Sequence, residues 1–196
     1  MTVHIINTHL TYPNWTEGRL NAAMATIAKE YFESQGQEVT FTMVEDSYDA
    51  ATEERRHLAS DLVILQTPIN WFGAPWIYKK YVDEVFNAGL ASQSFLANDG
   101  RTADDPTRQY GTGGHMAGKK FLIAATWNAP KLTFGNPESL LFAGKSADDL
   151  LLNISTNYKF TGFEVLPSFG IFDIFRDQEI EKRLAEYKNY LHSIAI

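Results

Sequence analysis

The sequence alternates short apolar runs with segments whose apolar residues recur at helical spacing, and this alternation constrains the fold more than any other feature. The apolar run at residues 61–67, DLVILQT, is followed by helical spacing at residues 76–86. Right-handed crossovers between parallel strands place the intervening helices on both faces of a sheet. The pattern therefore predicts an α/β fold with a five-stranded parallel sheet. The expected strands are residues 3–6, 38–44, 61–67, 119–126 and 163–169, and the expected helices lie between Thr16 and Gly36 and at about 52–60, 76–86, 147–158 and 180–194.

The length and the absence of cysteine limit both the domain count and the chemistry. At 196 residues with 44% hydrophobic content, the chain is long enough for one substantial core, so we expect a single domain over residues 1–196. The chain has no cysteine, which excludes disulfides, thiolate nucleophiles and cysteine-ligated zinc or iron–sulfur clusters. Any redox chemistry must then be carried by a bound organic cofactor.

The charge distribution argues against nucleic acid and membrane partners. The formal net charge is −7, and the lysines and arginines are scattered in ones and twos, so no basic face for a phosphate backbone is expected. The amino-terminal MTVHIINTH has no basic segment followed by a long apolar stretch, and no run approaches the length of a bilayer span. We expect a soluble, cytoplasmic protein with no membrane insertion.

In open parallel sheets, ligands bind outside the carboxyl ends of the strands, near the point where the strand order reverses. For the order 2-1-3-4-5, that point lies between the first and third strands. The loops after the first, third and fourth strands should therefore converge. These loops carry His9, Trp71 and Trp127.

The loop after the first strand, NTHLTYPNWTEGRLN, leads into a helix N-terminus, where free backbone N–H groups and the helix dipole favour an anion. Gly18 permits close backbone approach, Thr16 offers a hydroxyl and serves as the expected N-cap, and Arg19 and Asn21 could reach a pyrophosphate. The loop has neither the GK[ST] nor the GxGxxG pattern. Taken alone, it is compatible with phosphate binding or with a simple helix cap.

Two further loops are suited to a flat ring. TPINWF, after the third strand, offers backbone amides beyond Pro68 and aromatic walls from Trp71 and Phe72. TWNAP, after the fourth strand, offers Thr126 and Asn128 and backbone amides that could stabilise negative charge. The alternatives are that these aromatic residues fill the core or form a subunit interface. Their place at strand ends favours the binding interpretation.

Residues 87–118 show turn chemistry without strong periodicity, which is typical of a functional or disordered loop. Within QYGTGGHMAGKK, Tyr110 presents both a stacking face and a hydroxyl, whereas His115 is interpreted as an exposed loop residue. The five histidines have no metal-like spacing with carboxylates, so no metal site is predicted. No catalytic triad or glycosidase carboxylate pair is evident.

Six segments match a known family in order and spacing: EGRLN at 17–21, PINWFGAPWIYKKYVDEVF at 68–86, DGRT at 99–102, YGTGG at 110–114, GKK at 118–120 and TWNAP at 126–130. In these segments the chain resembles the flavin quinone reductases with a flavodoxin-like fold. The resemblance is closest to the modulator of drug activity B family of bacterial NADPH:quinone oxidoreductases. It extends over nearly the whole chain.

The resemblance implies a flavodoxin-like sheet of order 2-1-3-4-5, noncovalently bound FAD, NADPH as co-substrate, a quinone as acceptor, and a homodimer with sites near the subunit interface. Carried over by position, residues 16–21 would face the phosphates, residues 68–72 and 126–129 would hold the isoalloxazine, and His9 would lie near the pyrophosphate. Tyr110 would contact the flavin. The expected cofactor-binding residues are His9, Thr16, Gly18, Arg19, Leu20, Asn21, Pro68, Ile69, Asn70, Trp71, Phe72, Tyr110, Thr126, Trp127, Asn128 and Ala129.

The expected reaction is a two-step, ping-pong transfer of a hydride from NADPH through the flavin to a quinone. The related animal-type quinone reductases have a tyrosine and a histidine after the fourth strand that assist proton movement, and TWNAPKLTF offers neither. No residue is therefore assigned as general acid, and Tyr110 or solvent could serve. The alternatives are a flavin reductase of azo or nitroaromatic acceptors and a flavodoxin-like FMN electron carrier. The aromatic loops and the long 87–118 segment favour an enclosed substrate pocket over an exposed flavin edge.

Overall fold

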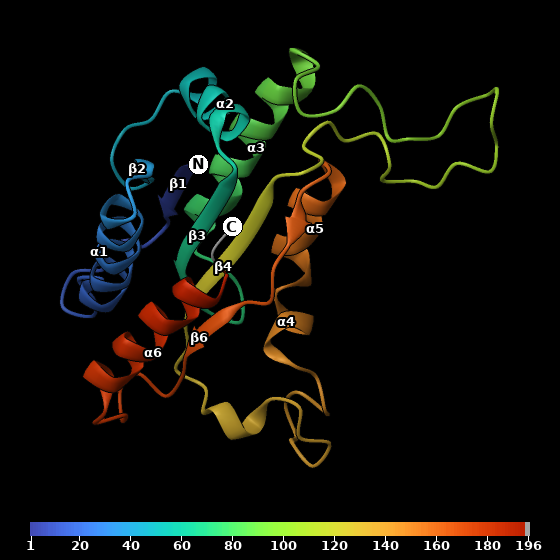
Figure 1. Cartoon of the computed structure of the whole chain (residues 1–196). Helices are drawn as coiled ribbons and strands as arrows, with labels where there is room; N and C mark the ends of the chain where they lie inside the picture. The colour runs from blue at the N-terminus through green and yellow to red at the C-terminus, as the bar shows by residue number, and fades with distance from the viewer. Residues whose placement is uncertain (195–196) are drawn as a thin grey trace.

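The computed structural model describes residues 1–194 and has a parallel sheet at its centre (Figure 1). The strand order is β2-β1-β3-β4-β5, β6 also pairs with β4, and all pairings are parallel. This confirms the predicted α/β class and the order 2-1-3-4-5. The strands are β1 (Thr2–Asn7), β2 (Glu38–Met43), β3 (Leu62–Pro68), β4 (Lys120–Thr126), β5 (Glu164–Val165) and β6 (Phe169–Ile171).

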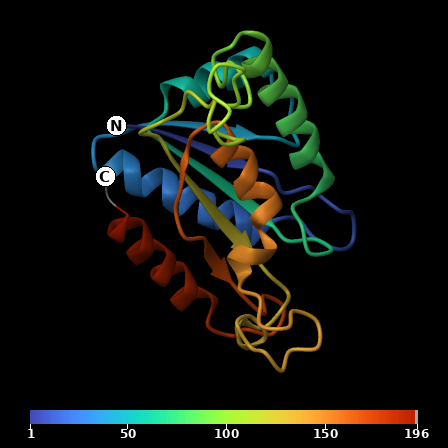
Figure 2. The ribbon, with the colours of Figure 1, turned by 90° about the vertical axis from the view of Figure 1, so that its right-hand side faces the viewer.

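The helices cover both faces of the sheet (Figures 1 and 2). Helices α1 and α6 pack on one face, and α2, α3 and α5 pack on the other. Alternate residues of the buried strand β3 serve the two cores, because successive strand side chains point to opposite faces. The helices are α1 (Arg19–Ser34), α2 (Ala50–Ala59), α3 (Trp76–Ala91), α4 (Ala147–Leu150), α5 (Leu152–Phe160) and α6 (Ile180–Ser193), with a 3-10 turn η1 at Lys131–Thr133. Within residues 1–194, none of these helices combines the length and the apolar character that crossing a bilayer requires.

The fifth strand is not the continuous segment that the sequence predicts at 163–169. It is divided into β5 and β6, which pair with successive parts of β4. Pro167 lies in the gap and has no N–H to donate to the ladder, so the chain leaves the sheet there and rejoins it at Phe169.

Two helical predictions also need correction. The helix expected at 147–158 is divided at Leu151, and α3 runs five residues past the predicted end at Phe86. Gly89 weakens the helical signal near that end. It is needed there because the ring of Phe95 lies against it, where a Cβ atom would come within 2.4 Å of the ring.

The connection between α3 and β4 projects away from the body of the molecule (Figure 1). Its base is closed by a short antiparallel bridge between Leu96 and Gly114, and a hydrogen bond from the Gly111 N–H to the Asp99 carbonyl joins its two sides at 2.7 Å. The segment expected to be a functional or disordered loop is thus an extended excursion with a defined base.

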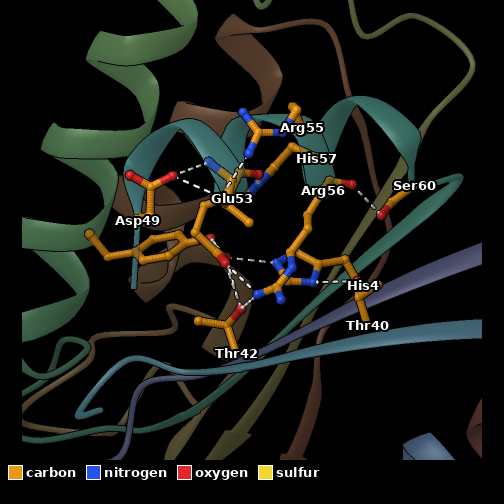
Figure 3. A network of polar contacts seen from close by, with 11 residues as sticks. His4, Thr40, Thr42, Asp49, Glu53, Arg55, Arg56, His57 and Ser60 are labelled. Atoms are coloured by element: carbon orange, nitrogen blue, oxygen red, sulfur yellow. Dashed lines mark hydrogen bonds and ion pairs between the residues drawn. The ribbon is translucent and has the colours of Figure 1, made fainter. Parts of the chain in front are cut away.

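A buried polar network ties α2 to the sheet and to α3 (Figure 3). The carboxylate of Glu53 lies 3.1 Å from the ring Nε2 of His4 and accepts hydrogen bonds from Thr42 at 2.9 Å, from Tyr81 at 2.7 Å and from Arg56 at 2.6 Å. Glu53 is almost completely buried. Its charge is therefore matched by several partners at once.

Candidate functional site

A pocket of about 930 Å³ lies at the carboxyl end of the sheet. Its walls come from the loops after β1, β3 and β6 and from the segment between β4 and α4. Gly18, Pro68 and Asn128, which come from three separate loops, all line it. The expected convergence of these loops is what the structure shows, and the volume is at the upper end of the range for small-molecule sites.

All of the predicted cofactor-binding residues except Tyr110 line this pocket. They are His9, Thr16, Gly18, Arg19, Leu20, Asn21, Pro68, Ile69, Asn70, Trp71, Phe72, Thr126, Trp127, Asn128 and Ala129.

One end of the pocket is built by the start of α1. The N-cap is Gly18, with φ 71°, and no side chain caps the helix, so the prediction of Thr16 as N-cap is wrong. Thr16 instead forms a small hairpin with Tyr12, through backbone hydrogen bonds of 3.0 and 3.1 Å. The first N–H groups of a helix have no acceptor within the helix. They leave this end of the pocket suited to an anionic group.

His9 packs against the start of α1. It is nearly buried, its backbone N–H donates to the Asn7 side chain at 3.0 Å, and its ring lies against Gly18. A Cβ atom at Gly18 would come within 2.3 Å of that ring. Burial lowers the pKa of His9, against a weaker opposing effect of Glu45, and thereby favours the neutral imidazole.

The turn after β3 places two aromatic side chains at the mouth of the pocket. Asn70 and Gly73 exchange backbone hydrogen bonds of 2.8 and 3.2 Å, and the two residues between them, Trp71 and Phe72, both have positive φ. Bulky residues in the left-handed region cost of order 1–2 kcal/mol each. Trp71 is nevertheless 92% exposed. A strained backbone that holds an aromatic side chain in solvent is characteristic of a ligand-binding element.

The backbone amides available to a ligand are fewer than the sequence suggests. The N–H of Ile69 donates to Thr126 O, and the N–H of Trp127 donates to Ile171 O, so both are used within the fold. Within residues 1–194, the N–H groups of Phe72, Asn128 and Ala129 have no protein acceptor. The Trp71 N–H has none in this range either, so four amides remain as donors for the edge of a bound ring.

Asn21 lines the pocket, and its side chain is also hydrogen-bonded to the sheet. Its side-chain oxygen accepts a hydrogen bond from Gln66 at 2.8 Å, and its side-chain nitrogen donates to the Thr126 hydroxyl at 3.2 Å. All three side chains are buried. The contact of Asn21 with a pyrophosphate stays a prediction, and its side chain joins α1 to β3 and β4.

Tyr110 lies outside this pocket. Its ring packs on Phe160 at 5.2 Å, with the guanidinium of Arg101 5.3 Å from the ring centre. It belongs to the projecting connection between α3 and β4, and about two thirds of its surface is exposed. The structure therefore does not bring Tyr110 together with the other predicted residues.

Sequence reasoning missed lining residues from three segments: the loop after β1, the segment between β4 and α4, and the loop after β6. The loop after β6 could have been found by applying the strand-end rule to the last strand, whereas the segment between β4 and α4 has no periodicity that marks it. The missed residues are Trp15, Pro130, Thr133, Ser139, Leu141, Phe142, Asp173, Ile174, Phe175 and Arg176, whereas Glu17 lies within the range 16–21 that was expected to face the phosphates.

The pocket combines an anion-binding helix end, a strained aromatic turn and free amides along one rim. This set fits a flat ring with a phosphorylated tail, because the helix start would hold the tail and the aromatic turn would face the ring. Within the described part of the chain, no group of three histidine, aspartate or glutamate side chains could hold a metal ion.

Comparisons with known proteins give the family and the fold. The family model Flavodoxin_2, described as a flavodoxin-like fold, matches residues 1–194. The Haemophilus influenzae NADPH:quinone oxidoreductase MdaB is 36% identical over 179 residues, which cover 91% of this chain and 92% of the relative. Among solved structures, a candidate quinone reductase from Klebsiella pneumoniae has a TM-score of 0.79 at 21% identity, over 99% of this chain and 85% of that one. General stress protein 14 from Treponema denticola, solved in complex with FMN, has a TM-score of 0.67 at 19% identity, over 99% of each chain. At these identities the two structures support the fold alone.

Proposed function

Since the chain belongs to the flavodoxin-like family, and within it to the quinone reductases related to MdaB, we propose that it is an FAD-dependent NADPH:quinone oxidoreductase with a ping-pong cycle. The family makes it a quinone-acting oxidoreductase with a flavin cofactor. FAD in place of FMN, NADPH as the donor and the alternation of the two substrates in one pocket are the parts that we propose.

The extent of the pocket supports FAD. Its lining includes Trp71 and Phe72 of the aromatic turn and also Phe175 and Arg176 of the loop after β6. FMN ends at its single phosphate, which the start of α1 would hold. Phe175 is mostly exposed, and an exposed aromatic side chain beside a cationic Arg176 suits the additional adenosine and phosphate of the dinucleotide.

In this proposal the chain's own residues bind, orient and shield. The α1 N-terminus holds the phosphates, the amides of Asn128 and Ala129 donate to the ring edge, and Trp71 and Phe72 cover the ring from water. Bound flavin supplies the chemistry, since it accepts a hydride and passes two electrons to a quinone. A single aromatic-walled pocket lets donor and acceptor occupy the same place in turn.

The projecting connection supports a homodimer. Tyr110 does not line the pocket of its own chain, and it belongs to a connection that extends beyond the body of the protein (Figure 1). Reaching the pocket of a second copy would give this residue the flavin contact that the family resemblance implies. The single domain over residues 1–196, of which 195 and 196 lie outside the described residues, and the cytoplasmic location remain predictions.

The observation that carries the proposal is that an uncapped helix start and a strained aromatic turn line the same pocket. The test is an absorbance spectrum of the purified protein, with the released flavin identified by mass. We expect FAD, bleaching on addition of NADPH, and recovery on addition of menadione. Parallel double-reciprocal lines are expected for the steady state. A colourless protein that no flavin reconstitutes would contradict the proposal, and intersecting lines would contradict the ping-pong cycle.

A further inference from the structure

Residues 135–145 form a closed loop beyond the carboxyl end of β4 (Figure 2). The Gly135 N–H donates to Lys145 O and the Gly144 N–H donates to Asn136 O, both at 2.9 Å, so the two ends of the loop are joined. A further bond, from the Ala143 N–H to Ser139 O at 2.9 Å, crosses its interior. The loop has no regular secondary structure, but this internal bonding gives it a defined shape before any ligand binds.

Phe142 anchors the loop to the aromatic part of the pocket. Its buried ring stacks on Phe134 with centroids 4.8 Å apart and an interplanar angle of 21°. It also meets Phe72 edge-on at 6.0 Å, and Phe134 in turn contacts Trp127 at 5.0 Å. The loop thus belongs to the part of the pocket formed by the turns after β3 and β4, where the redox chemistry of the proposed function takes place.

The two adjacent leucines of the loop differ in one respect. Leu141 lines the pocket and remains 65% exposed, whereas Leu140 is fully exposed and does not line the pocket. An apolar side chain that a rigid loop holds at a pocket wall gains its burial only when a ligand lies against it. The free energy of that burial grows with the apolar area of the ligand that touches it.

We propose that Leu141 is a specificity-determining residue that selects fused-ring, apolar quinones over single-ring quinones as electron acceptors. The inference rests on the proposed function and names the acceptor class for the same site. A second ring adds flat apolar surface, and the wall made by Leu141 and Phe142 beside Phe72 covers that surface without placing a charge against it. A single ring leaves more of this wall in water.

The test compares Leu141→Ala with the matched control Leu140→Ala, which removes the same atoms from the next residue of the same loop. Each purified, flavin-loaded protein is assayed with NADPH at fixed concentration and with menadione or 1,4-benzoquinone as acceptor. The quantity compared is the ratio of the two kcat/KM values. We expect Leu141→Ala to lower the menadione to benzoquinone ratio by about tenfold, and Leu140→Ala to leave it unchanged.

Three results separate the inference from the proposed function. An unchanged ratio in Leu141→Ala, or an equal change in both variants, would overturn the inference while leaving the function intact. Loss of flavin from Leu141→Ala alone would also overturn it, because the residue would then hold the cofactor. Failure of the wild-type protein to bind flavin or to oxidise NADPH would remove the proposed function together with this inference.

Discussion

The buried network around Glu53 and the pocket at the carboxyl end of the sheet use similar residue types in opposite ways. In the network, carboxylate, imidazole, hydroxyl and guanidinium groups satisfy one another (Figure 3). Tyr81, which also donates to Glu53, is completely buried. In the pocket, the α1 start lacks a side-chain cap, and Trp71 is exposed in a strained conformation.

The difference indicates that the network stabilises the fold and that the pocket leaves groups free to bind a ligand. A satisfied buried network holds α2 and α3 against the sheet, and losing one member leaves the others unpaired in a low-dielectric environment. At the pocket, the uncapped start of α1 and the free backbone amides lower the stability of the fold, and a ligand that bonds to them would restore it. Substitutions in the two regions should therefore separate folding from binding.

The largest effect is expected from Glu53→Gln. The side-chain amide introduced at this position would leave Arg56 without its buried counter-ion. Its NH2 group would also face groups that donate hydrogen bonds to the carboxylate, such as the hydroxyls of Thr42 and Tyr81. The free energy of unfolding, measured by urea denaturation, should fall by about 3–5 kcal/mol. The control is Glu33→Gln, which breaks an exposed ion pair with Lys29 and should cost at most about 1 kcal/mol. Equal losses in the two variants would show that the network has no special role.

Acid should weaken the same region. Burial by itself would raise the pKa of Glu53, but hydrogen bonds from His4, Tyr81 and Thr42 outweigh it and lower that pKa from 4.5 to about 2. Burial lowers the pKa of His57 from 6.5 to about 3. Between the folded and unfolded pKa values of each group, from 6.5 to about 3 for His57 and from 4.5 to about 2 for Glu53, the unfolded chain binds more protons than the folded one. The free energy of unfolding should thus fall as the pH drops below 6.5, and more steeply below 4.5.

The acid effect is checked by urea denaturation at a series of pH values between 7 and 3. Glu53→Gln removes the carboxylate, so its curve should lose the steeper part below pH 4.5. A wild-type stability that is constant across this range would contradict the assignment of Glu53 and His57 as groups with lowered pKa values.

The next effect concerns binding. Gly18→Ala places a Cβ atom within 2.3 Å of the His9 ring, so the ring must move and distort the helix start. Flavin affinity, measured by titrating the apoprotein, should fall on the order of 100-fold. Gly36→Ala is the matched control, because Gly36 has φ 72° and no atom within 4 Å of the added Cβ. That variant should cost about 1 kcal/mol of stability and leave flavin affinity unchanged.

The smallest effect on folding should come from Trp71→Ala. Because the side chain is exposed, the free energy of unfolding should change by at most about 0.5 kcal/mol. The kcat/KM for the quinone should nevertheless fall about tenfold, because the aromatic wall is lost. Trp76→Ala removes an equally large exposed ring that does not line the pocket, and it should leave kcat/KM unchanged. Equal losses of activity would remove Trp71 from the binding surface.

Local sequence patterns predicted much of the fold because they reflect local physics. The buried runs marked β1, β3 and β4 to within about one residue at each end, since a strand covered on both faces must be apolar throughout. Residues placed just after such strands could be assigned to one rim, because parallel strands end together. The position of Trp71, Asn128 and the start of α1 around one pocket follows from that rule.

What the tertiary structure alone decided are contacts between segments far apart in the sequence. The chain leaves the sheet at Pro167 and rejoins it as β6, because β4 continues beside the gap and offers a second pairing segment. Thr16 pairs with Tyr12 through its backbone, so Gly18 and not Thr16 is the N-cap of α1. The loop at 135–145 lines the pocket through an aromatic contact between Phe142 and Phe72, which no periodicity encodes. Short-range spacing determines which residues share a face of a helix or strand, whereas packing between distant segments determines what each face meets.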